Sequence, residues 1–145
     1  MTNNFKNKVD SYLSSEVGRL FIQYKNEAKD IDYTEKELCV TIDDALKYVL
    51  LTYGGAYIGV DLLPCSKDPN NKNQETILDY TKSIRDYYKE INVCHSIQLG
   101  YVISIDGNGD IIFVDSENKV KIFYHDNNEE ELLAKNFESF IIELI

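Results

Sequence analysis

The residues that most resemble a ligand-binding set lie in the segment DGNGD (106–110). Asp106 and Asn108 alternate with glycine as the first oxygen ligands of a calcium loop do, and Glu117 falls at the twelfth position. The sixth position of such a loop is a glycine that makes the sharp turn, but here it is Ile111. The segment is therefore predicted to be a hairpin turn, and we expect no calcium site or other cofactor.

A second candidate for chemistry is the adjacent pair Cys94 and His95. A nucleophilic thiol needs a base within hydrogen-bond reach and a third group that orients this base. His125 is the only other histidine, and no pattern places it near Cys94. The chain also lacks a glycine-rich phosphate loop and the H-E-x-x-H and G-x-S-x-G motifs. We therefore expect a buried thiol beside a loop histidine, and no enzymatic activity.

The three cysteines, Cys39, Cys65 and Cys94, are widely spaced, and no pair has the C-x-x-C spacing of a zinc site. Free thiols fit a reducing compartment, so we expect a cytoplasmic protein. The segment MTNNFKNKVDSYL at the start has no apolar core of a signal peptide. No apolar run approaches the roughly 20 residues that cross a bilayer.

Tyrosine, carboxylate and amide side chains at predicted strand ends and turns are the candidates for binding a partner, because rigid scaffolds present binding residues there. Tyrosine offers a large contact area at low entropic cost, and carboxylates offer complementary charge. An aspartate in a turn also caps that turn, which is the alternative role for each one. The predicted partner-binding residues are Tyr57, Asp61, Asp106, Asn108, Asp115 and Glu117.

The overall charge indicates which partners these residues would suit. Fifteen Lys and Arg residues against 25 Asp and Glu residues give a net charge of -10. Such a surface repels nucleic acid and anionic membranes, and it attracts basic proteins. Acidity also serves solubility alone, so charge by itself does not separate the two explanations. We expect a basic protein partner, no nucleic acid and no membrane, and the oligomeric state stays open.

The elements that must position these residues fit one domain, because 145 residues suit a single domain over 1–145. The apolar stripe of the first thirty residues predicts a helix that Gly18 can divide in two. A short helix is predicted over 33–39. A further helix begins at a capping box formed by Thr41 and Asp44 and ends at Gly54 and Gly55.

The second half of the chain is predicted from its change of hydrophobic period. The segment AYIGVDLL (56–63) predicts a strand, and 66–73 predicts an exposed loop. A helix is predicted over 74–92 with its buried stripe at Ile77, Tyr80, Ile84, Tyr87 and Ile91. Three strands follow as an antiparallel meander (101–105, 110–114 and 119–125), then a solvated loop (126–131) and a final helix (132–144).

The predicted fold class is thus α+β, a mostly antiparallel sheet with a C-terminal meander, flanked by N-terminal, central and C-terminal helices. Two segments, 34–59 and 103–141, resemble the SUKH superfamily, which includes the fungal Smi/Knr-type cell-wall regulators and many bacterial immunity proteins. The first resembles the family's pair of helices with a closing Gly-Gly. The second resembles its strands, its Gly-Asp turn and its final helix with two phenylalanines.

The chain departs from the family pattern at Ile42-Asp43, where Leu-Pro is usual, and at Tyr53, where Asn often precedes Gly-Gly. The resemblance implies a mixed sheet wrapped by helices and no established catalytic residues. In bacteria it implies an immunity protein that binds and neutralises a toxin encoded beside it. A nuclease with a basic cleft suits the charge of this chain. The alternative is a regulatory adaptor of the Smi/Knr type without any toxin.

Overall fold

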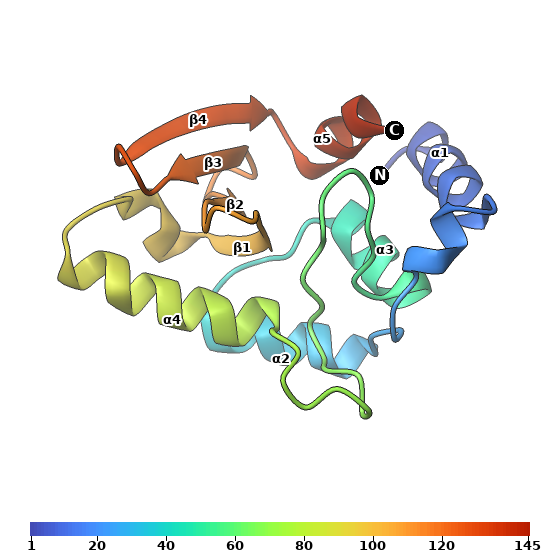
Figure 1. Ribbon diagram of the computed structural model, residues 1–145, viewed down its shortest axis with the longest axis horizontal. Coiled ribbons are helices and arrows are strands. Elements are labelled where there is room, and N and C mark those ends of the chain that lie inside the picture. Colours follow the sequence, from blue (N-terminus) through green and yellow to red (C-terminus); the bar gives the residue numbers. More distant parts are fainter.

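The computed structural model describes residues 1–145 and contains five α-helices around one four-stranded sheet (Figure 1). The helices are α1 (Asn3–Ser14), α2 (Ala28–Leu38), α3 (Asp44–Tyr53), α4 (Ile77–Glu90) and α5 (Phe137–Leu144), with two 3₁₀ helices, η1 (Gly18–Phe21) and η2 (His95–Leu99). The strands are β1 (Tyr101–Ile105), β2 (Ile111–Val114), β3 (Val120–Tyr124) and β4 (Glu129–Ala134). The predicted α+β class is confirmed.

The four strands form a meander in the order β1-β2-β3-β4, and every pair is antiparallel. The expectation of a mixed sheet is therefore wrong for this chain. All four residues of β2 are buried, which explains why Ile111 to Val114 are continuously apolar instead of alternating. Both faces of the sheet are covered, with α4 on one side, while α1, α3 and α5 gather at the other end of the molecule (Figure 1).

The two turns on either side of β2 have the same construction. In the first, Asp106 Oδ1 accepts hydrogen bonds from the amides of Asn108 and Asp110, at 2.9 Å each. In the second, Asp115 Oδ1 accepts from the amides of Glu117 and Lys119, at 2.9 and 3.0 Å. The fourth residue of each turn has a positive φ, 84° at Gly109 and 64° at Asn118. Each aspartate therefore closes its own hairpin, as turn chemistry predicts.

Helix α3 begins and ends close to the predicted positions. Asp43 is its N-cap, and the Asp43 side chain accepts from the amide of Ala45 at 2.8 Å. The predicted capping box of Thr41 and Asp44 is therefore wrong, because the N-cap is Asp43 and not Thr41. Gly54 ends the helix with φ 75° and ψ -162°, a conformation that is essentially confined to glycine. A Cβ at Gly54 would also lie 2.2 Å from the carbonyl oxygen of Tyr24.

The predicted helix over the first thirty residues is too long, because α1 ends at Ser14. The Ser15 hydroxyl donates to the carbonyl of Tyr12 and accepts from the amide of Gly18, which turns the chain. A Cβ at Gly18 would lie 1.9 Å from the Tyr12 carbonyl oxygen, so this turn requires glycine. The short helix predicted over 33–39 instead starts earlier, at Ala28, behind a capping box of Glu27 and Asp30.

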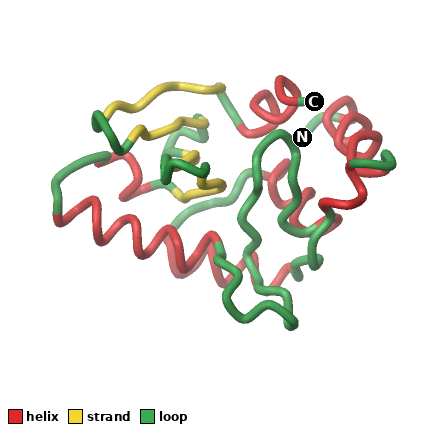
Figure 2. The backbone as a smooth tube through the Cα atoms, in the orientation of Figure 1, coloured by secondary structure: helices red, strands yellow, loops and turns green.

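The predicted strand over 56–63 is also wrong. This segment is a tight loop with two isolated bridges, Tyr57 to Asp61 and Leu62 to Ser104. The amide of Ile58 donates to the carbonyl of Val60 at 3.0 Å, so the backbone folds on itself and cannot extend along a partner strand. In Figure 2 this loop rises from the end of α3 toward the two termini before it descends to α4.

The C-terminal region contains a strand where a loop and a helix were predicted. The edge strand β4 occupies 129–134, and only its last residue, Ala134, is buried. Its charged, exposed residues carry no strand pattern, as is common for edge strands. Helix α5 therefore starts only at Phe137, where Asn136 caps it by accepting from the amide of Ser139 at 2.8 Å.

The core consists of two clusters of buried side chains. The larger one joins α1, α2, α3 and α5 to one face of the sheet, and the smaller one joins α4 and η2 to the other face. Phe123 belongs to the smaller cluster and is buried, although it follows Lys121 on the same face of β3. On α4, Ile77 is buried as predicted, but Tyr87 and Ile91 are exposed, and Tyr88 is buried instead.

Candidate partner-binding surface

Two aromatic rings from distant segments pack together on the surface. The rings of Phe21 and Tyr57 lie 5.4 Å apart between centroids, with an interplanar angle of 50°. Tyr57 stays 42% exposed, and Leu20, which lies beside Phe21 in the 3₁₀ helix η1, is 73% exposed. We define the Tyr57 surface as Phe21, Tyr57 and Asp61 with the exposed residues next to them along the chain or at the tip of the loop, Val17, Leu20 and Leu144. Contiguous patches of large exposed apolar residues are typical of interaction sites.

The segment that carries Phe21 is held against the end of α3 by its backbone. The amide of Gln23 donates to the Tyr53 carbonyl at 3.1 Å, and the amide of Asn26 donates to the Leu50 carbonyl at 3.0 Å. The buried Asn26 side chain accepts from the amide of Cys65 at 2.7 Å. These bonds tie the chain before and after α3 together, so Phe21 faces the loop that carries Tyr57.

The Tyr57 loop is itself anchored at both ends. The amide of Leu62 donates to the Ala56 carbonyl at 3.1 Å, and the Ser104 hydroxyl donates to the Asp61 carbonyl at 2.8 Å. The tip of the loop lies against the C-terminal helix, because a Cβ at Gly59 would meet Leu144 Cβ at 2.9 Å. A loop fixed in this way presents Tyr57 and Asp61 in one conformation, which lowers the entropic cost of binding.

Carboxylates border this apolar surface. Asp61 is exposed, yet neighbouring protein atoms remove part of the water around its carboxylate, and this raises the pKa of Asp61. Glu16 and Glu143, adjacent in sequence to Val17 and Leu144, are also exposed, as is the cation Arg19. An apolar centre with an acidic border suits a partner that offers apolar side chains flanked by basic ones.

The structure does not bring the six predicted residues together. Tyr57 and Asp61 share the surface described above. Asp106 and Asn108 lie in the β1–β2 turn, and Asp115 and Glu117 lie in the β2–β3 turn, at the opposite end of β2. Within these turns Asn108 and Glu117 are exposed. The predicted set is thus distributed over three places.

Asp115 is buried and belongs to an ion-pair network. Its Oδ2 lies 3.0 Å from Lys121 Nζ, which is also 3.7 Å from Glu130 Oε2. Burial opposes the ionisation of Asp115, but the bonds from Lys121 and from the amides of its turn outweigh it, so the pKa of Asp115 is lowered. Glu117 pairs with Lys119 at 2.8 Å. Asp115 therefore has a structural role in its turn.

Asp106 lies near the pair formed by His125 and Asp110 at the other end of β2. His125 Nδ1 lies 2.7 Å from Asp110 Oδ1, and the His125 amide donates to the same oxygen at 3.0 Å. The hydrogen bond from the His125 backbone amide is the largest cause of the lowered pKa of Asp110. The hydrogen bond between the two side chains raises the pKa of His125. His125 Nε2 also lies 3.1 Å from Asp126. His125 is thus committed to carboxylates rather than to Cys94.

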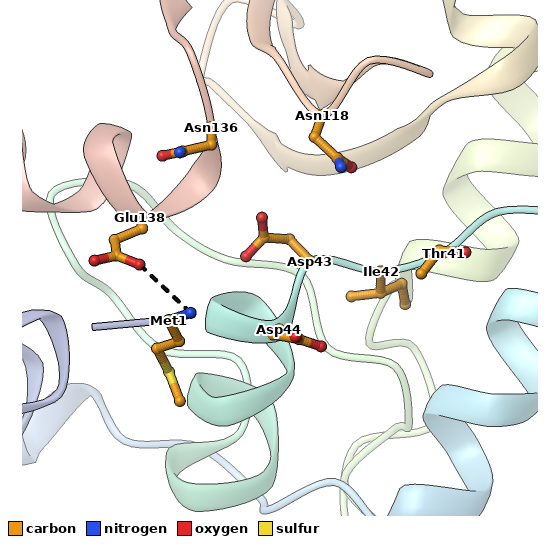
Figure 3. A pocket seen from close by; sticks show the side chains of 8 residues that line it. All are labelled: Met1, Thr41, Ile42, Asp43, Asp44, Asn118, Asn136 and Glu138. Atoms are coloured by element: carbon orange, nitrogen blue, oxygen red, sulfur yellow. Dashed lines mark ion pairs between the residues drawn. The ribbon is translucent and has the colours of Figure 1, made fainter. Parts of the chain in front are cut away.

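A polar cavity of about 270 Å³ lies between the start of α3, the β2–β3 turn and the start of α5 (Figure 3). Two of its polar side chains have a structural role, since Asp43 and Asn136 cap α3 and α5. The Glu138 carboxylate accepts from the amide of Thr2 at 3.2 Å and lies 3.9 Å from the Met1 ammonium. This cavity is explained by helix capping, so we place the partner site elsewhere.

The groups considered for catalysis do not form a reactive set. Cys39, Cys65 and Cys94 are all unpaired thiols. Burial raises the pKa of both Cys65 and Cys94 to about 12, so these thiols are protonated at neutral pH and are poor nucleophiles. No group of three or more His, Cys, Asp and Glu side chains is arranged to hold a metal ion. None of the helices combines the length and apolar character needed to cross a membrane.

A comparison with known protein families matches nearly the whole chain. The SUKH_5 family model, described as SMI1-KNR4 cell-wall, matches residues 5–145. The chain therefore belongs to the SMI1-KNR4 family, and the resemblance seen in 34–59 and 103–141 is confirmed. A comparison with curated proteins finds no match. Proteins with SUKH domains are generally non-catalytic immunity or adaptor proteins.

Four residues of the Tyr57 surface were missed by the sequence analysis, Leu144 on α5 and three near Gly18. Val17, Leu20 and Phe21 follow the helical stripe of the first thirty residues, which predicted them to be buried. The signal that separates them is the turn from Ser15 to Gly18, which ends α1 and carries these residues away from the core. Large apolar residues just beyond such a turn are candidates for exposure.

Proposed function

We propose that this protein is an immunity-type protein that binds a cognate toxin in the cytoplasm and neutralises it through the Tyr57 surface. The observation that supports this proposal is the exposed stack of Tyr57 on Phe21. Leu20 lies beside Phe21 on η1, and Asp61 pairs with Tyr57 within the loop that carries both. Aromatic anchors held rigidly at the centre of a contact dominate the binding energy of protein interfaces.

The charge of the chain supports a basic partner. A net charge of -10 speeds the encounter with a cationic protein, and it competes with nucleic acid for a basic cleft. A toxin that acts on nucleic acid carries such a cleft, so a nuclease is our preferred class of partner. The apolar centre of the Tyr57 surface supplies the slow dissociation that neutralisation requires.

An adaptor of the Smi/Knr type is the second candidate, and the description of the matched family as a cell-wall family favours it. An adaptor binds a partner of the same cell that is not toxic. The gene beside that of this protein separates the two proposals, because an immunity protein is encoded next to its toxin.

The test is co-expression in a host whose growth the neighbouring toxin domain stops. The immunity proposal predicts that the toxin domain alone stops growth and that this protein restores it. A catalytically inactive toxin domain serves as the control for toxicity. If the neighbouring gene encodes no toxin, or if growth is not restored, the immunity proposal fails and the adaptor proposal replaces it.

A further inference from the structure

A second cavity, of about 240 Å³, lies between α4 and the turns that flank β2 and β3 near His125. Six of its nine lining residues are hydrophobic, Ile84, Tyr87, Tyr88, Ile91, Val93 and Phe123. Gly109 and His125 complete its other side, next to the β1–β2 turn. None of these residues belongs to the Tyr57 surface, so the cavity is a separate feature of the molecule.

The walls of this cavity are aromatic and partly open to solvent. The rings of Tyr87 and Tyr88 lie 5.7 Å apart, and those of Tyr88 and Phe123 lie 5.0 Å apart. Tyr87 is 55% exposed, and Ile91, the residue that follows α4, is also exposed, although the helical stripe predicted over 74–92 has both buried. The helix thus turns two large apolar side chains toward solvent at the mouth of a cavity.

The Tyr88 hydroxyl is the unusual group in the cavity. Tyr88 is only 3% exposed, and its hydroxyl makes no hydrogen bond to the protein. The hydroxyls of Tyr48 and Tyr53, by contrast, both donate to Asp10 Oδ1 at 2.7 Å. The Tyr88 hydroxyl oxygen nevertheless keeps access to solvent, and Tyr88 lines the cavity. Tyr88 therefore offers a polar group that a guest in the cavity can satisfy.

Carboxylates lie next to His125, which lines the cavity. Asp110 and Asp126 both bond the His125 ring, at 2.7 and 3.1 Å, and Asp106 is close enough to interact with it electrostatically. Three carboxylates against one imidazole leave this border negative whether or not His125 is protonated. The charge complement of the cavity is therefore a cation.

The volume limits the size of the guest. Small-molecule sites are commonly about 300–1,000 Å³, so a cavity of about 240 Å³ is too small for most cofactors. It suits one long side chain. A guanidinium stacks on aromatic faces, donates several hydrogen bonds and stays charged at every physiological pH.

We propose that this cavity binds an arginine side chain presented by a protein partner. The aliphatic stem lies against Ile84 and Ile91, and the guanidinium stacks on the exposed aromatic wall. The guanidinium donates a hydrogen bond to the Tyr88 hydroxyl, while the border carboxylates supply the opposite charge. The site is independent of the Tyr57 surface and of the immunity proposal.

The test uses the whole protein and N-acetyl-L-arginine methylamide as the probe, followed by NMR of the aromatic and amide resonances. The resonances of Tyr87, Tyr88, Phe123 and His125 are expected to shift saturably, with a Kd of roughly millimolar order for a ligand of this size. The norleucine analogue has a similar stem without charge and should shift them much less. Tyr88→Phe should weaken the arginine probe about tenfold or more, the effect of one hydrogen bond from a charged donor.

The matched control is Tyr33→Phe, which removes a hydroxyl from an exposed tyrosine on α2 and should leave the affinity unchanged. Because the Tyr88 hydroxyl has no protein partner, Tyr88→Phe is expected to fold, and Tyr87→Ala provides a second variant at an exposed position. Equal shifts with the norleucine analogue, shifts scattered outside the cavity, or unchanged affinity in both variants would each overturn the proposal.

Discussion

Phe21 closes the 3₁₀ helix η1, and Tyr57 lies in the loop after α3. Their rings pack 5.4 Å apart because both segments are fixed to the C-terminal end of α3. Gln23 bonds the end of α3 from one side, and the loop of Tyr57 leaves this helix at Gly54 on the other side. A surface built in this way depends on the backbone that supports it. It can be tested separately from the core.

Charge at the edge of the Tyr57 surface is expected to act on the association rate. Asp61→Lys should slow association with a basic partner by about three- to tenfold at low salt, and the effect should shrink at physiological salt, where the Debye length is about 8 Å. Glu117→Lys changes the net charge equally but lies in the β2–β3 turn, so it is the control. Stopped-flow kinetics measures both. An equal effect of the two variants would assign the result to net charge and not to the Tyr57 surface.

Gly54 is expected to be required by the backbone. Gly54→Ala forces a side chain into a conformation essentially confined to glycine and toward the Tyr24 carbonyl, so it should destabilise the fold by about 2 kcal/mol or more. This corresponds to a fall in Tm of roughly 4–8 °C. Gly107→Ala is the matched control, because a Cβ there meets nothing within 4 Å. Thermal unfolding compares them, and similar Tm values would contradict the assigned end of α3.

Helix α5 is expected to be an integral part of the core. Phe140 is buried in the larger cluster, so Phe140→Ala should cost about 3–5 kcal/mol, against a total stability of roughly 5–15 kcal/mol. Leu144→Ala, at an exposed position of the same helix, should cost much less. Denaturant unfolding gives both values. An unchanged midpoint for Phe140→Ala would remove this helix from the core.

The pair of His125 and Asp110 is expected to make stability depend on pH. The pKa of His125 is raised in the folded state. Its contribution to stability is therefore complete below the pKa of the unfolded state, about 6.5, and is lost as the pH rises through the pKa of the folded state. The pKa of Asp110 is lowered, so its contribution is present above about 3.9 and is lost as the pH falls through the folded value. The pair therefore stabilises most between about pH 4 and 6.5.

Asp110→Asn tests this dependence. The difference in Tm between wild type and variant should be largest near pH 5–6. It should shrink above pH 7 as His125 loses its proton, because only the hydrogen bond from the His125 amide to the side chain of residue 110 then remains. An NMR titration should show a lower pKa for His125 in the variant. A difference in Tm that does not vary with pH would contradict the ion pair.

Much of the fold was predictable, because its signals are local. The turns at Asp106 and Asp115, the end of α3 at Gly54 and the first three strands all follow from turn chemistry and hydrophobic period. Strand β4 was not predictable, since an edge strand of charged residues gains its backbone bonds from β3 and leaves no apolar pattern. The exposed Tyr87 was equally hidden, because the face that α4 buries is set by where the sheet lies.

The partner surface was predictable only in part. Tyr57 and Asp61 stood out by residue type and by their place near the ends of a predicted strand. Their neighbour Phe21 did not, because the stack depends on hydrogen bonds between loops distant in sequence. Asp115 had the right type but is buried and paired with Lys121, a tertiary contact that its turn alone does not indicate.

The most direct test of the account is the affinity of this protein for the purified, inactivated toxin domain, measured by calorimetry. The wild-type protein should bind, and Tyr57→Ala and Phe21→Ala should each weaken binding by about 30-fold or more, as the loss of a central aromatic anchor does. Tyr33→Ala, which removes an exposed tyrosine from α2, should bind as the wild type does. Wild-type affinity in both the Tyr57 and the Phe21 variants, with their folds intact, would contradict the claim that this surface holds the partner.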